Sequence, residues 1–280
     1  MKVFISADME GATGVAVPNH VGKADPGEYA RMRRLLTGDV NAAVRGAIAA
    51  GAAECLVTDA HGSMTNILIE ELDEHARLTS GSNKHLCQME GVDPSYTAAL
   101  FVAYHSREGT EDGLLNHTLL GGTVAEMRCN GRPFGETALN AAIAGHFGVP
   151  VALVTGDDKV CAEAQAYLGD VEVVPVKIAY ERLVANSLPP VRTRELIAAG
   201  AERAIKRAAR GEIKPFVVPG PVTFEIDFKS TAGVKMALLF PEVELLGPKR
   251  LRVQAADYLA AFRLLWGTLI IVRASQSGVI

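Results

Sequence analysis

The sequence predicts an α/β fold: a mainly parallel sheet with helices on both faces, in three layers. Short apolar runs alternate with helical segments, beginning with a strand over 2–7, a helix over 28–50 and a second strand over 53–58. Strand–helix–strand is the unit that builds parallel sheets. Several of the apolar runs also end in polar side chains, at the edge where sheets of this kind bind ligands.

The same alternation continues along the chain. Further strands are predicted over 98–104, 151–155 and 171–178, and further helices over 137–147 and 159–168. Asn130-Gly131 separates two short segments and is a strong hairpin signal. Pro175 cannot donate to a strand ladder, so we expect the strand that contains it to lie at a sheet edge.

We expect two portions. Residues 1–180 form a metal-binding catalytic α/β domain, and residues 181–280 form a smaller α+β portion that contributes to oligomer contacts. Within the second portion we predict helices over 193–210 and 257–266 and strands over 222–228, 234–239 and 251–253. The apolar stretch 264–272 is too short to span a membrane, and we interpret it as buried core or a subunit contact.

Composition limits the partners of the chain. It has 280 residues, 49% of them hydrophobic and 21% charged, which is ordinary for a globular protein with a substantial core. The net charge of -4 leaves no basic stripe for nucleic acid, and we expect no membrane partner. The cysteines are scattered, without a CxxC pair, and no signal peptide is evident, so we expect a reducing cytoplasm. They are Cys55, Cys87, Cys129 and Cys161.

Two carboxylates follow the first predicted strand. Asp8 and Glu10 are two residues apart, so they can point to the same side of the extended chain. Neighbouring carboxylates repel, and a shared divalent cation is a common remedy. The alternative for an isolated D-x-E pair is one helix cap and one solvated acid. The metal interpretation therefore requires ligands from other strand ends.

Such ligands follow two other predicted strands and open one predicted helix. His61 comes after the second strand, where Asp59 could be a ligand or could orient the imidazole. His105 comes directly after the strand over 98–104, and Glu136 lies at the start of the next helix. A structural role for His61, and a favourable interaction of Glu136 with the helix dipole, remain the alternatives.

Three carboxylates and two imidazoles exceed the four ligands of a closed structural zinc site. They suit two ions about 3.5–4 Å apart, bridged by one carboxylate and with positions open to water. His117 follows a polar loop and could act as a general acid or base, or donate to a developing oxyanion, or have no task. Asp157 is interpreted as a helix N-cap, with a distant site role as the alternative.

These segments also resemble a known family. The motifs SADMEGATG, TDAHGSM, AYHS, NHT, GRPFGETALNAAIAGHFGVPV and VTGDD, all within residues 1–180, are similar to the D-aminopeptidases of the DppA type. The resemblance implies a dinuclear zinc aminopeptidase with two Zn2+ per subunit, acting on short peptides with an N-terminal D-amino acid such as D-alanine. It implies a decameric ring, metal ligands at Asp8, Glu10, His61, His105 and Glu136, and a catalytic role for His117.

We therefore expect metal-assisted hydrolysis of an amide bond. A dinuclear metal phosphoesterase uses similar ligands and is one alternative, although no cluster of arginines suited to phosphate is evident. A non-catalytic metal-binding ring protein is the other. The preference for D-amino acids depends on the resemblance alone.

Overall fold

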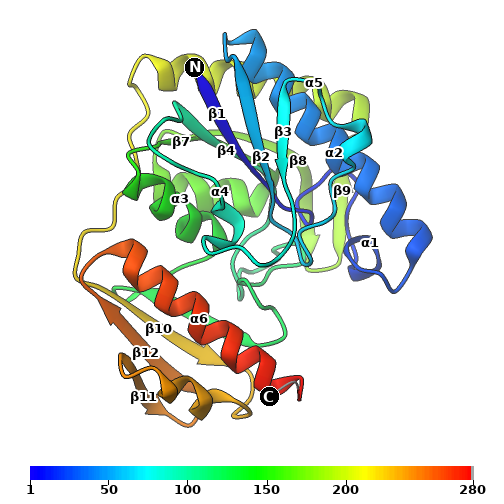
Figure 1. Cartoon of the computed structure of the whole chain (residues 1–280). Coiled ribbons are helices and arrows are strands. Elements are labelled where there is room, and N and C mark those ends of the chain that lie inside the picture. The colour runs from blue at the N-terminus through cyan, green and yellow to red at the C-terminus, as the bar shows by residue number, and fades with distance from the viewer. Residues whose placement is uncertain (279–280) are drawn as a thin grey trace.

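A seven-stranded sheet forms the centre of the larger body of the molecule (Figure 1). The structure is a computed structural model that describes residues 1–278. The strands lie in the order β3-β2-β1-β4-β7-β8-β9, and all neighbours are parallel except β8 and β9. They are β1 (Lys2–Ala7), β2 (Glu54–Asp59), β3 (Ala76–Thr79), β4 (Ala98–Tyr104), β7 (Val151–Asp157), β8 (Glu172–Glu181) and β9 (Val184–Ser187).

Helices cover both faces of this sheet. Val3 and Ile5 of β1 point to the face covered by α2 (Pro26–Ala49) and α5 (Pro190–Ala209) and share a core with them. Phe4, between them, points to the other face and shares a core with α3 (Glu136–His146) and α4 (Asp158–Leu168). Alternation along one strand thus builds two cores, and the predicted three-layer, mainly parallel α/β fold is confirmed.

A second, antiparallel sheet forms the lower body in Figure 1. Its order is β11-β12-β10-β5-β6. The helix α6 (Tyr258–Gln276) lies across it, and Phe262, Leu265 and Leu269 join the core on the α3 face. The two bodies therefore share one apolar core. The strands are β5 (Val124–Cys129), β6 (Arg132–Pro133), β10 (Val222–Phe228), β11 (Val243–Gly247) and β12 (Arg250–Ala255).

The predicted boundary between residues 180 and 181 does not coincide with the division between the sheets. The hairpin at Asn130-Gly131 forms as predicted, but its first strand, β5, pairs with β10, so the hairpin belongs to the second sheet. Conversely, β9 and α5 follow residue 181 and belong to the first sheet and its helical layer. Pairing between distant segments, which local patterns do not encode, causes the difference.

Three other local predictions differ from the structure. Val234–Leu239 is a 3-10 helix and not a strand. The prediction fails because the hydrophobic period of so short an apolar run does not distinguish a strand from a helical turn. The final helix extends beyond residue 266 to Gln276. Pro175 lies in β8, which is not the edge strand, but β9 pairs with β8 only from Lys177 onward, so Pro175 has a partner strand on one side.

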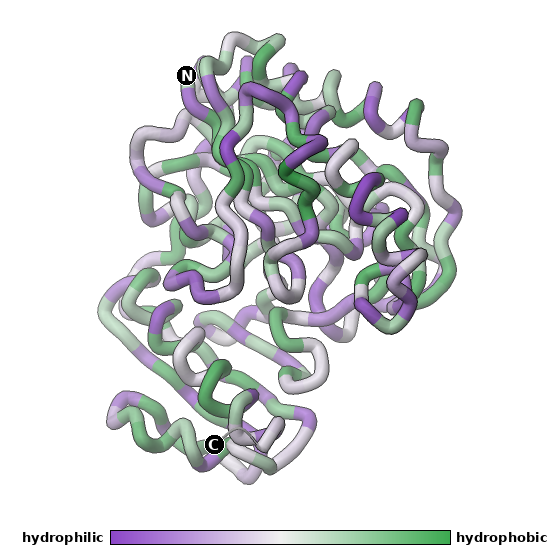
Figure 2. Tube along the Cα trace, turned by 45° about the vertical axis from the view of Figure 1, so that its right-hand side comes forward, coloured by the Kyte–Doolittle hydropathy of each residue, from purple (hydrophilic) through white to green (hydrophobic). Residues whose placement is uncertain are grey.

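The helix α6 is long and apolar enough to cross a membrane, judged by length and composition alone. This differs from the expectation that the apolar stretch 264–272, which lies within α6, is too short to span a membrane. Part of α6 is buried against the second sheet, including Leu265, Leu269 and Val272, and core helices of soluble proteins pass the same test. Figure 2 shows other hydrophobic stretches of the trace gathered inside the larger body.

Candidate metal centre

All the predicted site residues meet at the carboxyl ends of three adjacent strands. Asp8 and Glu10 follow β1, which lies between β2 and β4. His61 follows β2 by two residues, and His105 follows β4 directly. Glu136 is the first residue of α3, on one face of the same sheet. The parallel register therefore delivers side chains from distant segments to one edge.

The first half of the cluster is formed by His61 and two carboxylates. His61 Nδ1 lies 2.9 Å from Glu10 Oε2 and 3.4 Å from Asp8 Oδ1. Glu10 and Asp8 are 5% and 2% exposed. Two buried acids thus face a single ring nitrogen.

His105 occupies the matching position in the second half. Its Nε2 lies 3.4 Å from Asp8 Oδ2 and 3.3 Å from Glu136 Oε1. Asp8 therefore presents one oxygen to each histidine. The two halves share this carboxylate, which is the arrangement expected of a residue that bridges two cations.

Each of the three histidines at this edge has one ring nitrogen next to a backbone carbonyl. His61 Nε2 lies 2.8 Å from Val21 O, His105 Nδ1 lies 2.9 Å from Ser106 O, and His117 Nδ1 lies 2.9 Å from Leu115 O. A carbonyl only accepts, so each of these nitrogens donates. The other nitrogen of each ring faces the carboxylates. These hydrogen bonds fix the orientation of each ring, as in metal sites.

The donor set fits divalent cations. Asp8 Oδ2 and His105 Nε2 are buried and have no hydrogen-bond partner within residues 1–278. Such atoms are costly to leave unpaired. Among residues 1–278, potential ligand atoms of Asp8, Glu10 and His105 all lie within 4.8 Å of one another, and so do those of His105, His117 and Glu136. Carboxylate oxygens and imidazole nitrogens are ligands that zinc accepts.

The charges in the cluster are strongly coupled. Burial alone would lower the pKa of His61 and of His105, but the facing carboxylates raise both pKa values well above the usual range. Burial alone would raise the pKa of Glu10 and of Glu136, but the histidines lower both. A buried cluster with three acids is held together here by positive charge, which bound cations would also supply.

His117 lies beside the second half of the cluster. Its Nε2 is 3.8 Å from Glu136 Oε1, and its side chain is 19% exposed, against 1% for His105. The two imidazole rings are stacked, with centroids 4.0 Å apart. His117 is therefore the histidine of the cluster most accessible to an incoming molecule.

Buried amides support Glu136, and the local sequence offers little indication of them. Gln88 Nε2 donates to Glu136 Oε2, and Asn140 Nδ2 donates to Gln88 Oε1 at 2.6 Å and to Tyr104 Oη at 2.9 Å. The backbone N–H of Leu119 donates to Glu136 Oε1 at 2.7 Å. Asn140 lies one helical turn after Glu136, which is the only local signal of this contact.

Lys177 supports the loop that carries the acids after β1. Its Nζ donates to three backbone carbonyls, those of Glu10 at 2.6 Å, Ala12 at 2.9 Å and Val15 at 2.8 Å. The side chain is 2% exposed, and burial lowers its pKa to about 7. Lys177 comes from β8, far along the sequence, and was not predicted as a site residue.

Asp59 and Asp157, for which the sequence leaves two roles possible, both accept hydrogen bonds from backbone N–H groups. Asp59 accepts from the backbone N–H groups of Asn66 and Ile67 and from His61 N at 3.3 Å, so it shapes the loop that carries His61. Asp157 is the N-cap of α4, accepting from Val160 N, as predicted. Its second oxygen accepts from Leu114 N at 2.9 Å, close to the His117 loop.

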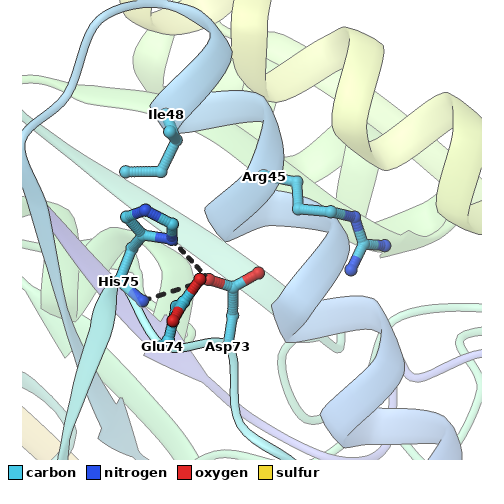
Figure 3. A pocket seen from close by; sticks show the side chains of 5 residues that line it. All are labelled: Arg45, Ile48, Asp73, Glu74 and His75. Carbon is cyan, nitrogen blue, oxygen red and sulfur yellow. Dashed lines mark hydrogen bonds and ion pairs between the residues drawn. The ribbon is translucent and has the colours of Figure 1, made fainter.

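A surface pocket lies apart from this cluster (Figure 3). Arg45 and Ile48 of α2 and residues 73–75 line it. His75 is exposed, and its Nδ1 lies 3.0 Å from Asp73 Oδ1. The pocket contains one histidine and none of the converging carboxylates, so the strand-end cluster remains the candidate site.

The fold and this cluster define a metal-dependent hydrolase of the α/β class. The D-aminopeptidase family model matches residues 1–266, and the chain belongs to this family. It is 33% identical over 266 residues to the D-aminopeptidase of Bacillus subtilis, covering 94% of each chain. A solved structure, the Zn-dependent D-aminopeptidase DppA from Bacillus subtilis, a self-compartmentalizing protease, matches with a TM-score of 0.91, 32% identity and 98% coverage of both chains. The predicted family and enzyme class are confirmed.

Proposed function

We propose that this chain is a zinc-dependent aminopeptidase that removes the N-terminal residue from short peptides and prefers N-terminal D-amino acids such as D-alanine. One structural observation carries the hydrolytic assignment: Asp8 faces His61 with one oxygen and His105 with the other, in a buried cluster of three acids. The family and the similar Zn-dependent enzyme support the metal and the substrate class.

Two Zn2+ per subunit would be held by the five clustered side chains. Asp8, Glu10 and His61 would hold one ion, and His105 and Glu136, with Asp8 shared, would hold the other. The ions would supply Lewis acidity, which would polarise the substrate carbonyl and lower the pKa of a bound water to about 7. Asp8 would neutralise charge on both sides of the centre.

His117 would move the proton during hydrolysis. Its Nδ1 is committed to Leu115 O, so Nε2 is the nitrogen available to accept a proton from the nucleophile or to donate one to the leaving amine. The carboxylate of Glu136 lies 3.8 Å from Nε2. The stack on His105 limits rotation of the imidazole.

The assembly and the location extend the same proposal. We propose a decameric ring, supported by the similar structure being that of a self-compartmentalizing protease, with the portion from residue 181 onward contributing to the subunit contacts. We propose a cytoplasmic location, supported by cysteines that are all free and buried: Cys55, Cys87, Cys129 and Cys161.

A comparison of substrates tests the function. The zinc-loaded protein is given D-alanyl and L-alanyl p-nitroanilides and a chromogenic phosphodiester. We expect hydrolysis of the D-alanyl amide, slower hydrolysis of its L-isomer and none of the phosphodiester. Turnover of the phosphodiester alone would favour a dinuclear phosphoesterase. A zinc-loaded protein that cleaves none of a broad peptide panel would favour the non-catalytic ring protein.

A further inference from the structure

The turn between β8 and β9 contacts the segment that carries His117. Leu115 N donates to Arg182 O at 2.8 Å. The Arg182 guanidinium donates through Nε to Asn116 Oδ1 at 3.0 Å and through Nη2 to Asn116 O at 3.2 Å. A single residue thus makes three hydrogen bonds to the two residues that precede His117.

These hydrogen bonds stabilise the backbone of Leu115 and Asn116, which has an unfavourable conformation at Leu115. Leu115 has φ of 49°, the left-handed region that non-glycine residues rarely adopt. Its carbonyl is the acceptor for His117 Nδ1, so the peptide geometry at Leu115 sets the ring orientation. Asn116 Nδ2 donates to Thr110 O at 2.6 Å, which leaves its Oδ1 and its carbonyl to the guanidinium.

We propose that Arg182 is the positioning residue for His117. Its planar guanidinium donates to both oxygens of Asn116 at once, which a lysine ammonium on a flexible stem does not reproduce in the same fork geometry. Within residues 1–278, Arg182 makes no hydrogen bond or ion pair to the cluster of acids and histidines, and it acts through Asn116 and Leu115. The proposal rests on the catalytic role proposed above for His117.

Because of its location, Arg182 can be substituted to test its positioning role with little effect on the stability of the fold. The residue lies in an exposed turn outside both apolar cores, so its substitution removes no buried packing. The hydrogen bond between Leu115 N and Arg182 O uses only the backbone and persists in any side-chain variant. Substitution of Arg182 removes the two side-chain hydrogen bonds to Asn116, so the backbone next to His117 can shift. A displacement of a catalytic group by about 1 Å can lower the rate 100-fold.

The test compares Arg182→Met and Arg182→Lys with Arg192→Met. Arg192 is an exposed arginine of α5 that pairs with Glu195 at 3.1 Å, and it serves as the matched control. For Arg182→Met we expect unchanged zinc content and KM and a kcat roughly 10- to 100-fold lower. Arg182→Lys should recover little of this loss. Amide hydrogen exchange in the metal-free protein should become faster at residues 115–119 in Arg182→Met and not in the control.

A double-mutant cycle with His117→Ala decides whether Arg182 acts through His117. We expect Arg182→Met to cause no further loss in the His117→Ala background. Full additivity, or a kcat within twofold of wild type for Arg182→Met alone, would overturn the proposal. If His117→Ala is itself fully active, the catalytic role of His117 fails and the positioning role fails with it. If His117→Ala is inactive and Arg182→Met is fully active, the positioning role alone fails.

Discussion

The imidazole of His117 lies flat against that of His105, with 11° between the ring planes and 4.0 Å between the centroids. One ring is buried between two carboxylates, and the other is partly exposed. The stack therefore places a ring suited to hold a cation directly beside a ring suited to exchange protons. This contact joins a function that the sequence assigns to a strand end, at His105, with one that it assigns to a loop, at His117.

Replacement of His117 should separate these functions. We expect His117→Ala to keep its full zinc content and to lose about 100- to 10,000-fold in kcat, because a general acid or base is removed while the buried ligands remain. Elemental analysis and kinetics on a D-alanyl amide measure both quantities. His146→Ala, at the exposed end of α3, is the control and should match wild type. Unchanged turnover in His117→Ala would remove this residue from the mechanism.

Replacement of His61 should affect the metal instead. His61→Ala removes the ring nitrogen that faces Glu10 and Asp8, so we expect zinc content to fall by about one ion per subunit. Elemental analysis after dialysis measures it. His75→Ala, which removes an exposed histidine at the pocket of Figure 3, is the matched control. Full occupancy in His61→Ala would contradict the ligand role.

The sequence predicts the site better than it predicts the support around the site. Asp8, His61 and His105 could be found because each follows an apolar run, and parallel strands bring such positions to one edge. Their roles as ligands stay predictions, but their convergence is a structural fact. The second sheet could not be assembled from local patterns, because β5 and β10 are paired across some hundred residues of sequence.

Lys177 shows the same limit within the site. Its Nζ contacts the carbonyl of Glu10 although 167 residues separate them in sequence. From the local sequence, a lysine in a strand is expected to be exposed to solvent, and only the tertiary fold buries Lys177. Gln88, which donates to Glu136, lies in a short 3-10 helix without a recognisable motif.

Loss of Lys177 should loosen the loop that carries the acids. Lys177→Met keeps the length of the side chain but leaves the carbonyls of Glu10, Ala12 and Val15 without their donor. We expect a loss of roughly 3 kcal/mol in the free energy of unfolding and weaker zinc binding. Denaturant titration and competition with a chelator measure these. Lys206→Met, on the exposed face of α5, is the control. Wild-type zinc affinity in Lys177→Met would contradict the supporting role.

Asp39 gives the stability a specific dependence on pH. It is 1% exposed in α2 and accepts from Thr13 N at 2.8 Å, and burial raises its pKa to about 6, from 3.8 in the unfolded chain. The folded state therefore holds a proton that the unfolded chain releases between pH 4 and 6. The stabilisation that this group contributes to the free energy of unfolding is fully present below pH 4. It is lost as the pH rises to 6, by about 3 kcal/mol.

A variant at this position tests the dependence. Asp39→Asn cannot ionise and should lack this loss. The difference in unfolding free energy between Asp39→Asn and wild type should thus grow from pH 4 to 6 and then stay level, as measured by urea titration. Asp170→Asn, at an exposed carboxylate, is the control. A difference that does not change over this range would show that Asp39 ionises at the same pH in both states.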